Sequence, residues 1–72
     1  MAQIVKFTAL DGQGGTMIIT TNASNIMKVE PTSDSRFVQV LVRGMKHNMK
    51  WYLSAEPQEE IENRIRKALR FQ

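Results

Sequence analysis

Side chains capable of enzymatic chemistry are scarce in this 72-residue chain, which has one histidine, His47, and no cysteine. Of its seven acidic residues, only Asp11, Glu30 and Asp34 lie outside the start of a predicted C-terminal helix. A nucleophile needs a nearby base and an acid that orients it, and this chain cannot assemble such a set with any clarity. We therefore expect no enzyme, no catalytic residue and no cofactor.

Two local patterns have simpler explanations than a ligand site. Glu59, Glu60 and Glu62 resemble a metal-binding cluster, but acidic residues in the first turn of a helix also complement its dipole. The glycine-rich residues 11–15 lack the Gly-Lys-Ser/Thr ending of a phosphate-binding loop and precede a β-branched run instead of a helix. We predict no metal site, and a hairpin loop at 11–15.

The charge asymmetry of the chain lies between residues 36 and 52. This stretch has four basic residues, three aromatic residues and no acid. Sheets that bind single-stranded nucleic acid combine a positive surface with aromatic stacking platforms, whereas basic residues on a hairpin also block edge-to-edge aggregation. Both interpretations stay open. The candidate residues for binding a partner or a nucleic acid are Phe37, Leu41, Arg43, Lys46, Lys50 and Tyr52.

These residues are positioned by a predicted hairpin of residues 36–43 and 49–53. Val38, Val40 and Val42 alternate at period two and indicate a buried sheet face. We expect Met49, Trp51 and Leu53 to continue that core face on the return strand. The opposite face would then carry Phe37, Gln39, Leu41, Arg43, Lys50 and Tyr52.

The remaining elements predict an α+β fold, a four-stranded antiparallel β-meander with one C-terminal α-helix packed on the sheet. Strands are expected at 3–10 and 16–21, and residues 26–30 as an extended or single-turn segment. Residues 57–71 predict a helix whose apolar stripe faces the hairpin. We expect one β-β-β-β-α domain over residues 1–72. The helical stripe consists of Ile61, Ile65, Ala68 and Leu69, and the expected ion pairs are Glu60 with Arg64 and Glu62 with Arg66.

A chain of this size buries a limited core, and it contains no cysteine and a single histidine with which to build a disulfide or a zinc site. Self-association is the remaining way to add stability, so we expect a homodimer or higher homo-oligomer. Its interface would be the Phe37/Leu41/Tyr52 face or an adjoining strand edge. The first residues lack the apolar run of a signal peptide, and we expect a cytoplasmic protein that does not insert into membranes.

Several short segments resemble the FlbD/SwrD family of small bacterial flagellar and swarming-motility proteins. The matching segments are Val-Lys-Phe-Thr-Ala-Leu-Asp-Gly at 5–12, Asn-Ile-Met-Lys-Val-Glu-Pro at 25–31, Trp-Tyr-Leu at 51–53 and Glu-Glu-Ile-Glu-Asn-Arg-Ile at 59–65. The resemblance implies a strand, turn and helix order like the one above and a motility-related role. A β-meander of phage or mobile-element origin shares such turn-and-strand signals and is the other source we consider.

The sequence therefore predicts a small non-enzymatic adaptor or regulatory protein that acts through protein–protein contacts, with a protein partner it does not identify. The alternative is a small regulator that binds single-stranded nucleic acid through the basic 36–52 hairpin. A net charge of +3 permits an anionic partner without requiring one.

Overall fold

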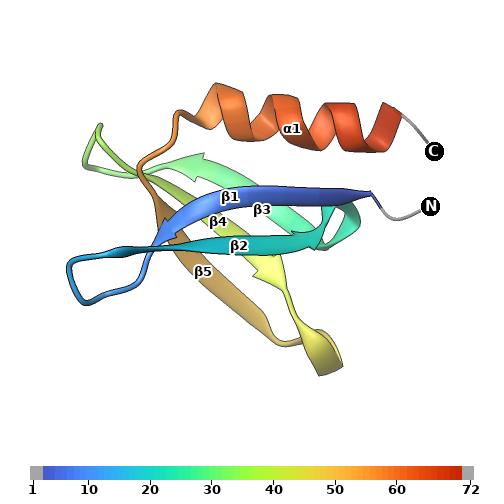
Figure 1. Ribbon diagram of the computed structural model, residues 1–72, viewed down its shortest axis with the longest axis horizontal. Helices are drawn as coiled ribbons and strands as arrows, with labels where there is room; N and C mark the ends of the chain where they lie inside the picture. Colours follow the sequence, from blue (N-terminus) through green and yellow to red (C-terminus); the bar gives the residue numbers. More distant parts are fainter. Residues whose placement is uncertain (1–2, 71–72) are drawn as a thin grey trace.

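The computed structural model describes residues 3–70 and contains five strands, two 3-10 turns and one α-helix (Figure 1). β-branched and aromatic residues at alternating positions form the strands, and the amphipathic C-terminal segment forms the helix. The elements in chain order are β1 (Ile4–Leu10), β2 (Thr16–Asn22), η1 (Ala23–Asn25), β3 (Ile26–Pro31), β4 (Val38–Arg43), η2 (Met45–His47), β5 (Met49–Ser54) and α1 (Gln58–Arg70).

The strands form two antiparallel sheets, β1-β2 and β3-β4-β5, so the prediction of a single four-stranded meander was wrong. The cause lies at η1. The Asn22 side chain accepts a hydrogen bond from the Ser24 backbone N–H and starts a tight turn, after which the chain enters a second sheet. Residues 26–30, predicted as an extended or single-turn segment, belong to the edge strand β3, which ends at Pro31.

One hydrophobic core joins the two sheets and the helix. It is formed by alternate residues of β1 and β4 together with one residue of α1. Figure 1 shows α1 running along β1 with β3 beside it, and these are the strands that it contacts most. The central buried residues are Phe7, Ala9, Val40, Val42 and Ile61.

The register of β5 differs from the predicted one by a residue. Val38, Val40 and Val42 are buried as predicted, but their partners on β5 are Ser54, Tyr52 and Lys50. Because side chains alternate across a strand, this register turns the predicted core residues of β5 outward. The prediction that they are buried was wrong, since the exposed fractions are 52% for Met49, 46% for Trp51 and 43% for Leu53.

Helix α1 begins just after Pro57, whose carbonyl accepts hydrogen bonds from the N–H groups of Glu60 and Ile61. The predicted end at Phe71 lies outside the described residues. Ile61 is fully buried and Ile65 packs against the core, whereas Leu69 is 38% exposed. The helix contacts mainly β1 and β3, and Ile61 shares the buried cluster with Val40. The predicted packing of the helix on the Val40 face is therefore right in part, and it was wrong for Trp51 and Leu53, which are exposed.

The two ion pairs predicted within α1 do not form among residues 3–70. Arg64 pairs with Glu56, which lies before the helix, and Arg66 donates a hydrogen bond to the Asn63 side chain. Glu56 offers both carboxylate oxygens to the planar guanidinium, a geometry stronger than an exposed pair within one helix.

Candidate interaction surface

The solvent side of the three-stranded sheet is the most distinctive surface of the protein. Cross-strand pairing places Leu41 between Lys28 of β3 and Trp51 of β5. Gln39 lies between Glu30 and Leu53, and Arg43 pairs with Met49. We call this surface the outer sheet face and define it by Lys28, Glu30, Gln39, Leu41, Arg43, Met49, Trp51 and Leu53.

The outer sheet face is substantially apolar. Met49, Trp51 and Leu53 project along β5 with about half of each side chain exposed, and Leu41 beside them is partly buried. Met27 of β3, also exposed, is the extra residue of a β-bulge between Ile26 and Lys28. A contiguous group of large apolar side chains left in water is the usual mark of a binding surface.

Charged groups border this apolar centre. Lys28 is exposed and Arg43 is partly exposed. The carboxylate of Glu30 accepts a hydrogen bond of 3.2 Å from the Gln39 side-chain amide, so this acid is held by a neighbour within the face. The outer sheet face thus combines an apolar centre with two basic groups and one acid, a distribution that resembles the core and rim of a protein interface.

The structure divides the predicted binding residues between the two faces of the sheet. Leu41 and Arg43 lie on the outer sheet face, as expected. Tyr52 lies on the core face, where its ring meets the Phe7 ring edge-on at a centroid distance of 6.1 Å. Lys50 follows Tyr52 to that side and places its ammonium 5.2 Å from the centre of the tyrosine ring. The prediction of one common face was therefore wrong for Lys50 and Tyr52.

Two further predicted residues lie in connections. Phe37 precedes β4, is partly buried, and has the Arg36 guanidinium 5.2 Å from its ring centre. Lys46 is exposed in the η2 turn, where it has a φ of 58°. Its ammonium is therefore carried by a turn beyond the ends of β4 and β5, away from the apolar centre around Leu41.

Arg36, one of the four basic residues of the hairpin region, is paired. Its side chain donates three hydrogen bonds to the Asp34 carboxylate, and the closest contact is 2.7 Å between Nη2 and Oδ2. These bonds lower the pKa of Asp34 to about 2, so the pair stays ionised at neutral pH. Arg36 is therefore engaged within its own loop, which reduces the positive charge available for a phosphate backbone.

Sequence reasoning missed the exposed apolar residues of β5 and Met27 of β3. Their residue types alone did not reveal them, because Trp51 and Leu53 are common core residues. The signal that decides their direction is the connection between β4 and β5, which pairs Arg43 with Met49 across five turn residues. This register sets which alternate residues of β5 share a face with Val40.

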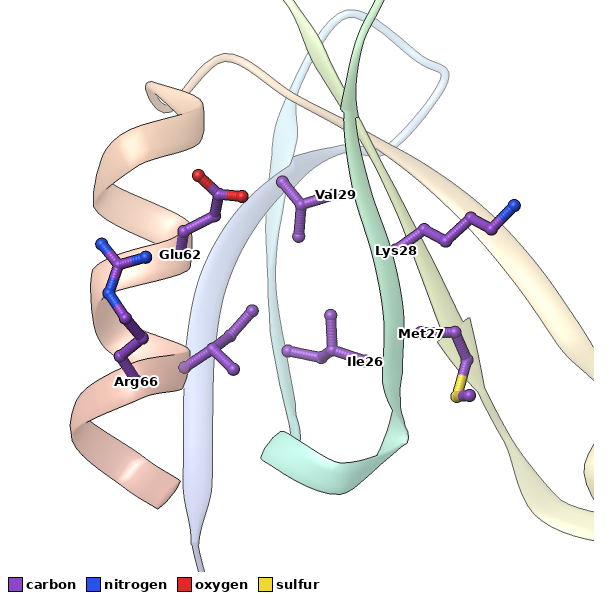
Figure 2. Close-up of a pocket in the computed structure, with 7 residues that line it drawn as sticks. Ile26, Met27, Lys28, Val29, Glu62 and Arg66 are labelled. Carbon is purple, nitrogen blue, oxygen red and sulfur yellow. The ribbon is translucent and has the colours of Figure 1, made fainter. Parts of the chain in front are cut away.

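A shallow groove separates α1 from β3 on the other side of the sheet. Figure 2 shows Ile26 and Val29 pointing toward the helix, whereas Met27 and Lys28 point away from it. The bulge at Met27 explains this three-residue spacing in a strand. Glu62 and Arg66 line the helix side of the groove. The floor belongs to the hydrophobic core, so the groove adds little free apolar surface.

Residues 3–70 contain no group of three metal-ligating side chains, and no helix within them is long and apolar enough to cross a membrane. A scan against protein-family models and searches of curated proteins and of solved structures found no match to this chain.

Proposed function

We propose that this protein is a small non-enzymatic adaptor or regulatory protein whose outer sheet face binds a protein partner. The observation that supports it is the row of half-exposed Met49, Trp51 and Leu53 beside Leu41. Large apolar side chains exposed together on a rigid sheet lose contact with water when a partner covers them, and that burial favours association. The resemblance to small motility proteins supports a role in regulation through contacts.

Trp51 is the expected centre of the contact. Tryptophan is enriched among the interface residues that contribute most to binding, and such residues lie near the middle of an interface. Leu41 and Leu53 flank it in the structure, and Lys28 and Arg43 lie at the border. A partner that fits this surface presents an apolar patch bordered by at least one acidic group.

The alternative, binding of single-stranded nucleic acid, has one supporting observation on the same surface. Trp51 is an exposed aromatic ring on the edge strand β5, and the next strands of the sheet, β4 and β3, carry Arg43 and Lys28. Base stacking on such a ring, with nearby cations, is how many sheets bind single strands. The alternative is less well supported because Tyr52 packs against Phe7 and Lys50 against Tyr52, which removes both from the outer sheet face.

The fluorescence of Trp51 reports directly on this surface, because it is the only tryptophan in the chain. Titration with single-stranded DNA and RNA should leave the emission unchanged if the partner is a protein. If the alternative holds, the emission changes on binding, and the affinity falls as salt rises with a slope of about 0.7 per neutralised phosphate. The second result would contradict the protein-contact proposal.

Affinity capture from cell extract, followed by quantitative mass spectrometry, tests the proposal with matched variants. We expect Trp51→Ser to lose proteins that the wild-type chain retains. The control is Ile4→Ser, which changes an apolar side chain of similar exposure, 47%, on the other sheet. If the wild type, Trp51→Ser and Ile4→Ser all retained the same proteins, the outer sheet face would not be the binding surface.

A further inference from the structure

Two hydrogen bonds outside the β1-β2 ladder show which way the backbone N–H and carbonyl groups of these strands point. The N–H of Thr8 and the carbonyl of Lys6 bond to side chains of Glu56 and Arg64, so the backbone groups of these residues point away from β2. In an antiparallel ladder, directly paired residues point their backbone groups in matching directions, either toward each other or both outward. Their partners Ile18 and Thr20 therefore point their own backbone groups away from β1.

The edge of β1 opposite β2 is closed. Glu56 Oε2 accepts the Thr8 N–H at 3.0 Å, and Arg64 Nη1 donates to the Lys6 carbonyl at 3.1 Å. The Glu56–Arg64 ion pair thus bonds to β1 as a neighbouring strand would. In the second sheet, the Gln58 side chain donates to the Val29 carbonyl on the outer edge of β3.

The free edge of β2 has no such cover among the described residues. Its ladder is made with β1 alone, and no side chain of residues 3–70 bonds to the outward N–H or carbonyl groups of Thr16, Ile18 or Thr20. The Ile18 side chain is 71% exposed, the highest value of any strand residue among the exposed large apolar side chains. An uncovered strand edge of this kind is a template for pairing with another chain.

Among the strands of residues 3–70, β2 is also the only one that lacks a charge or a proline. Natural proteins place such residues on strand edges to prevent pairing with other chains. β2 reads Thr-Met-Ile-Ile-Thr-Thr-Asn, so two copies can approach without repulsion between like charges. The charged or proline residues of the other strands are Lys6 in β1, Lys28, Glu30 and Pro31 in β3, Arg43 in β4 and Lys50 in β5.

We propose that two copies of the chain pair antiparallel along the free edge of β2. The pairing makes a continuous four-stranded sheet, β1-β2-β2-β1, around a two-fold axis. A two-stranded sheet gains stability from further strands, and this arrangement extends the β1-β2 hairpin without moving α1. The proposal concerns the first sheet and is independent of the function proposed for the outer sheet face.

The outward backbone groups restrict the register, and we place the two-fold axis at Ile18, the middle one of Thr16, Ile18 and Thr20. A two-fold axis at Ile18 opposes Ile18 to its copy and Thr16 to Thr20 of the partner subunit, which uses outward groups on both chains. The side chains that meet are then β-branched on both sides, the pairs that suit a sheet surface. In each subunit Lys6 lies on β1, and β2 separates β1 from the axis. The two Lys6 ammonium groups therefore stay well apart.

Sedimentation of Ile18→Lys and Ile18→Glu variants tests this interface. We expect the wild-type chain to sediment as a dimer at high micromolar concentration and each variant as a monomer, because the axis opposes like charges. An equimolar mixture of the two variants should recover the dimer mass, since the opposed charges then attract. Ile18 is exposed in the monomer, and circular dichroism of each variant should match that of the wild type.

Two control variants separate this edge from other surfaces. Ile4→Lys adds the same charge to β1, where Ile4 is opposite Asn22 and away from the axis, and should leave the dimer intact. Trp51→Ser changes the outer sheet face and should also leave it intact. A monomeric wild-type chain, a dimer that persists in Ile18→Lys, or a dimer lost in Trp51→Ser would each overturn the proposal.

Discussion

Glu56 holds several parts of the fold together through one carboxylate. It accepts two hydrogen bonds from Arg64, at 2.8 and 2.9 Å, and one from the backbone of Thr8. The hydrogen bonds from Arg64 lower the pKa of Glu56 below its usual value, and partial burial opposes them more weakly. A group whose pKa is lowered in the folded state stabilises the fold when it is ionised.

We therefore expect the contribution of Glu56 to be complete above its ordinary pKa, near 4.5, and to be lost as the pH falls through the lower folded value. Glu56→Gln should lower the free energy of unfolding by about 1–2 kcal/mol at neutral pH, because the Arg64 and Thr8 donors lose their charged acceptor. Urea unfolding at neutral and at strongly acidic pH measures the change. The difference in the free energy of unfolding between variant and wild type should be smaller at strongly acidic pH than at neutral pH.

The matched control for this prediction is Glu59→Gln, which alters an exposed carboxylate at the start of α1. We expect its effect to stay within about 0.5 kcal/mol. A Glu56→Gln deficit that is the same size in acid as at neutral pH would show that the ionised carboxylate is not the source of the stability.

The η2 turn holds two consecutive non-glycine residues in the left-handed region, Lys46 at a φ of 58° and His47 at 63°. A side chain in that region crowds the backbone. His47→Gly should therefore raise the free energy of unfolding by about 1 kcal/mol. Asn48→Gly is the control, since Asn48 has a φ of −70° and gains no such relief. Thermal unfolding measures both variants, and an Asn48→Gly variant more stable than His47→Gly would contradict this account.

Among the elements, α1 contributes to the fold mainly through its first two turns. Ile61 is fully buried and Ile65 packs against the core cluster, whereas the last turn leaves Leu69 partly exposed. The helix therefore covers the gap between β1 and β3 near its start. The loss of stability on replacing an apolar residue of α1 should therefore depend more on its position along the helix than on its type.

Ile61→Ala should lower the free energy of unfolding by about 2–5 kcal/mol, because it leaves a cavity in the core. Leu69→Ala removes a side chain that is already 38% exposed and should cost less than about 1 kcal/mol. Chemical denaturation of the two variants measures the difference. Equal losses would mean that the end of the helix packs as tightly as its start.

For the whole molecule, pairing through β2 links stability to concentration. A dimer that forms only from folded chains stabilises the folded state more as the protein concentration rises. The thermal midpoint of the wild type should therefore increase with concentration, and that of Ile18→Lys should stay constant. Calorimetry over a wide concentration range provides the measurement. A wild-type thermal midpoint that did not change with protein concentration would show that the folded chains do not associate.

The sequence by itself determined much of the local structure. Alternation in residues 38–42 predicted the buried face of β4, and the turn-forming residues at 11–15 predicted the first hairpin. The amphipathic pattern after Pro57 predicted α1 with Ile61 in the core. These features depend on neighbours within a few residues, and the periods of strand and helix make them visible. Leu41 and Arg43 were placed correctly on the outer sheet face for the same reason.

Only the tertiary structure decided the register of β5 and the division into two sheets. A shift of one residue reverses every side chain of a strand, and the register here depends on the turn that connects Arg43 to Met49. That turn uses a left-handed Lys46 and His47, which no pattern in the sequence indicates. Trp51 is therefore half exposed and Tyr52 lies in the core, because the geometry of the turn before β5 outweighs the hydrophobicity of each residue.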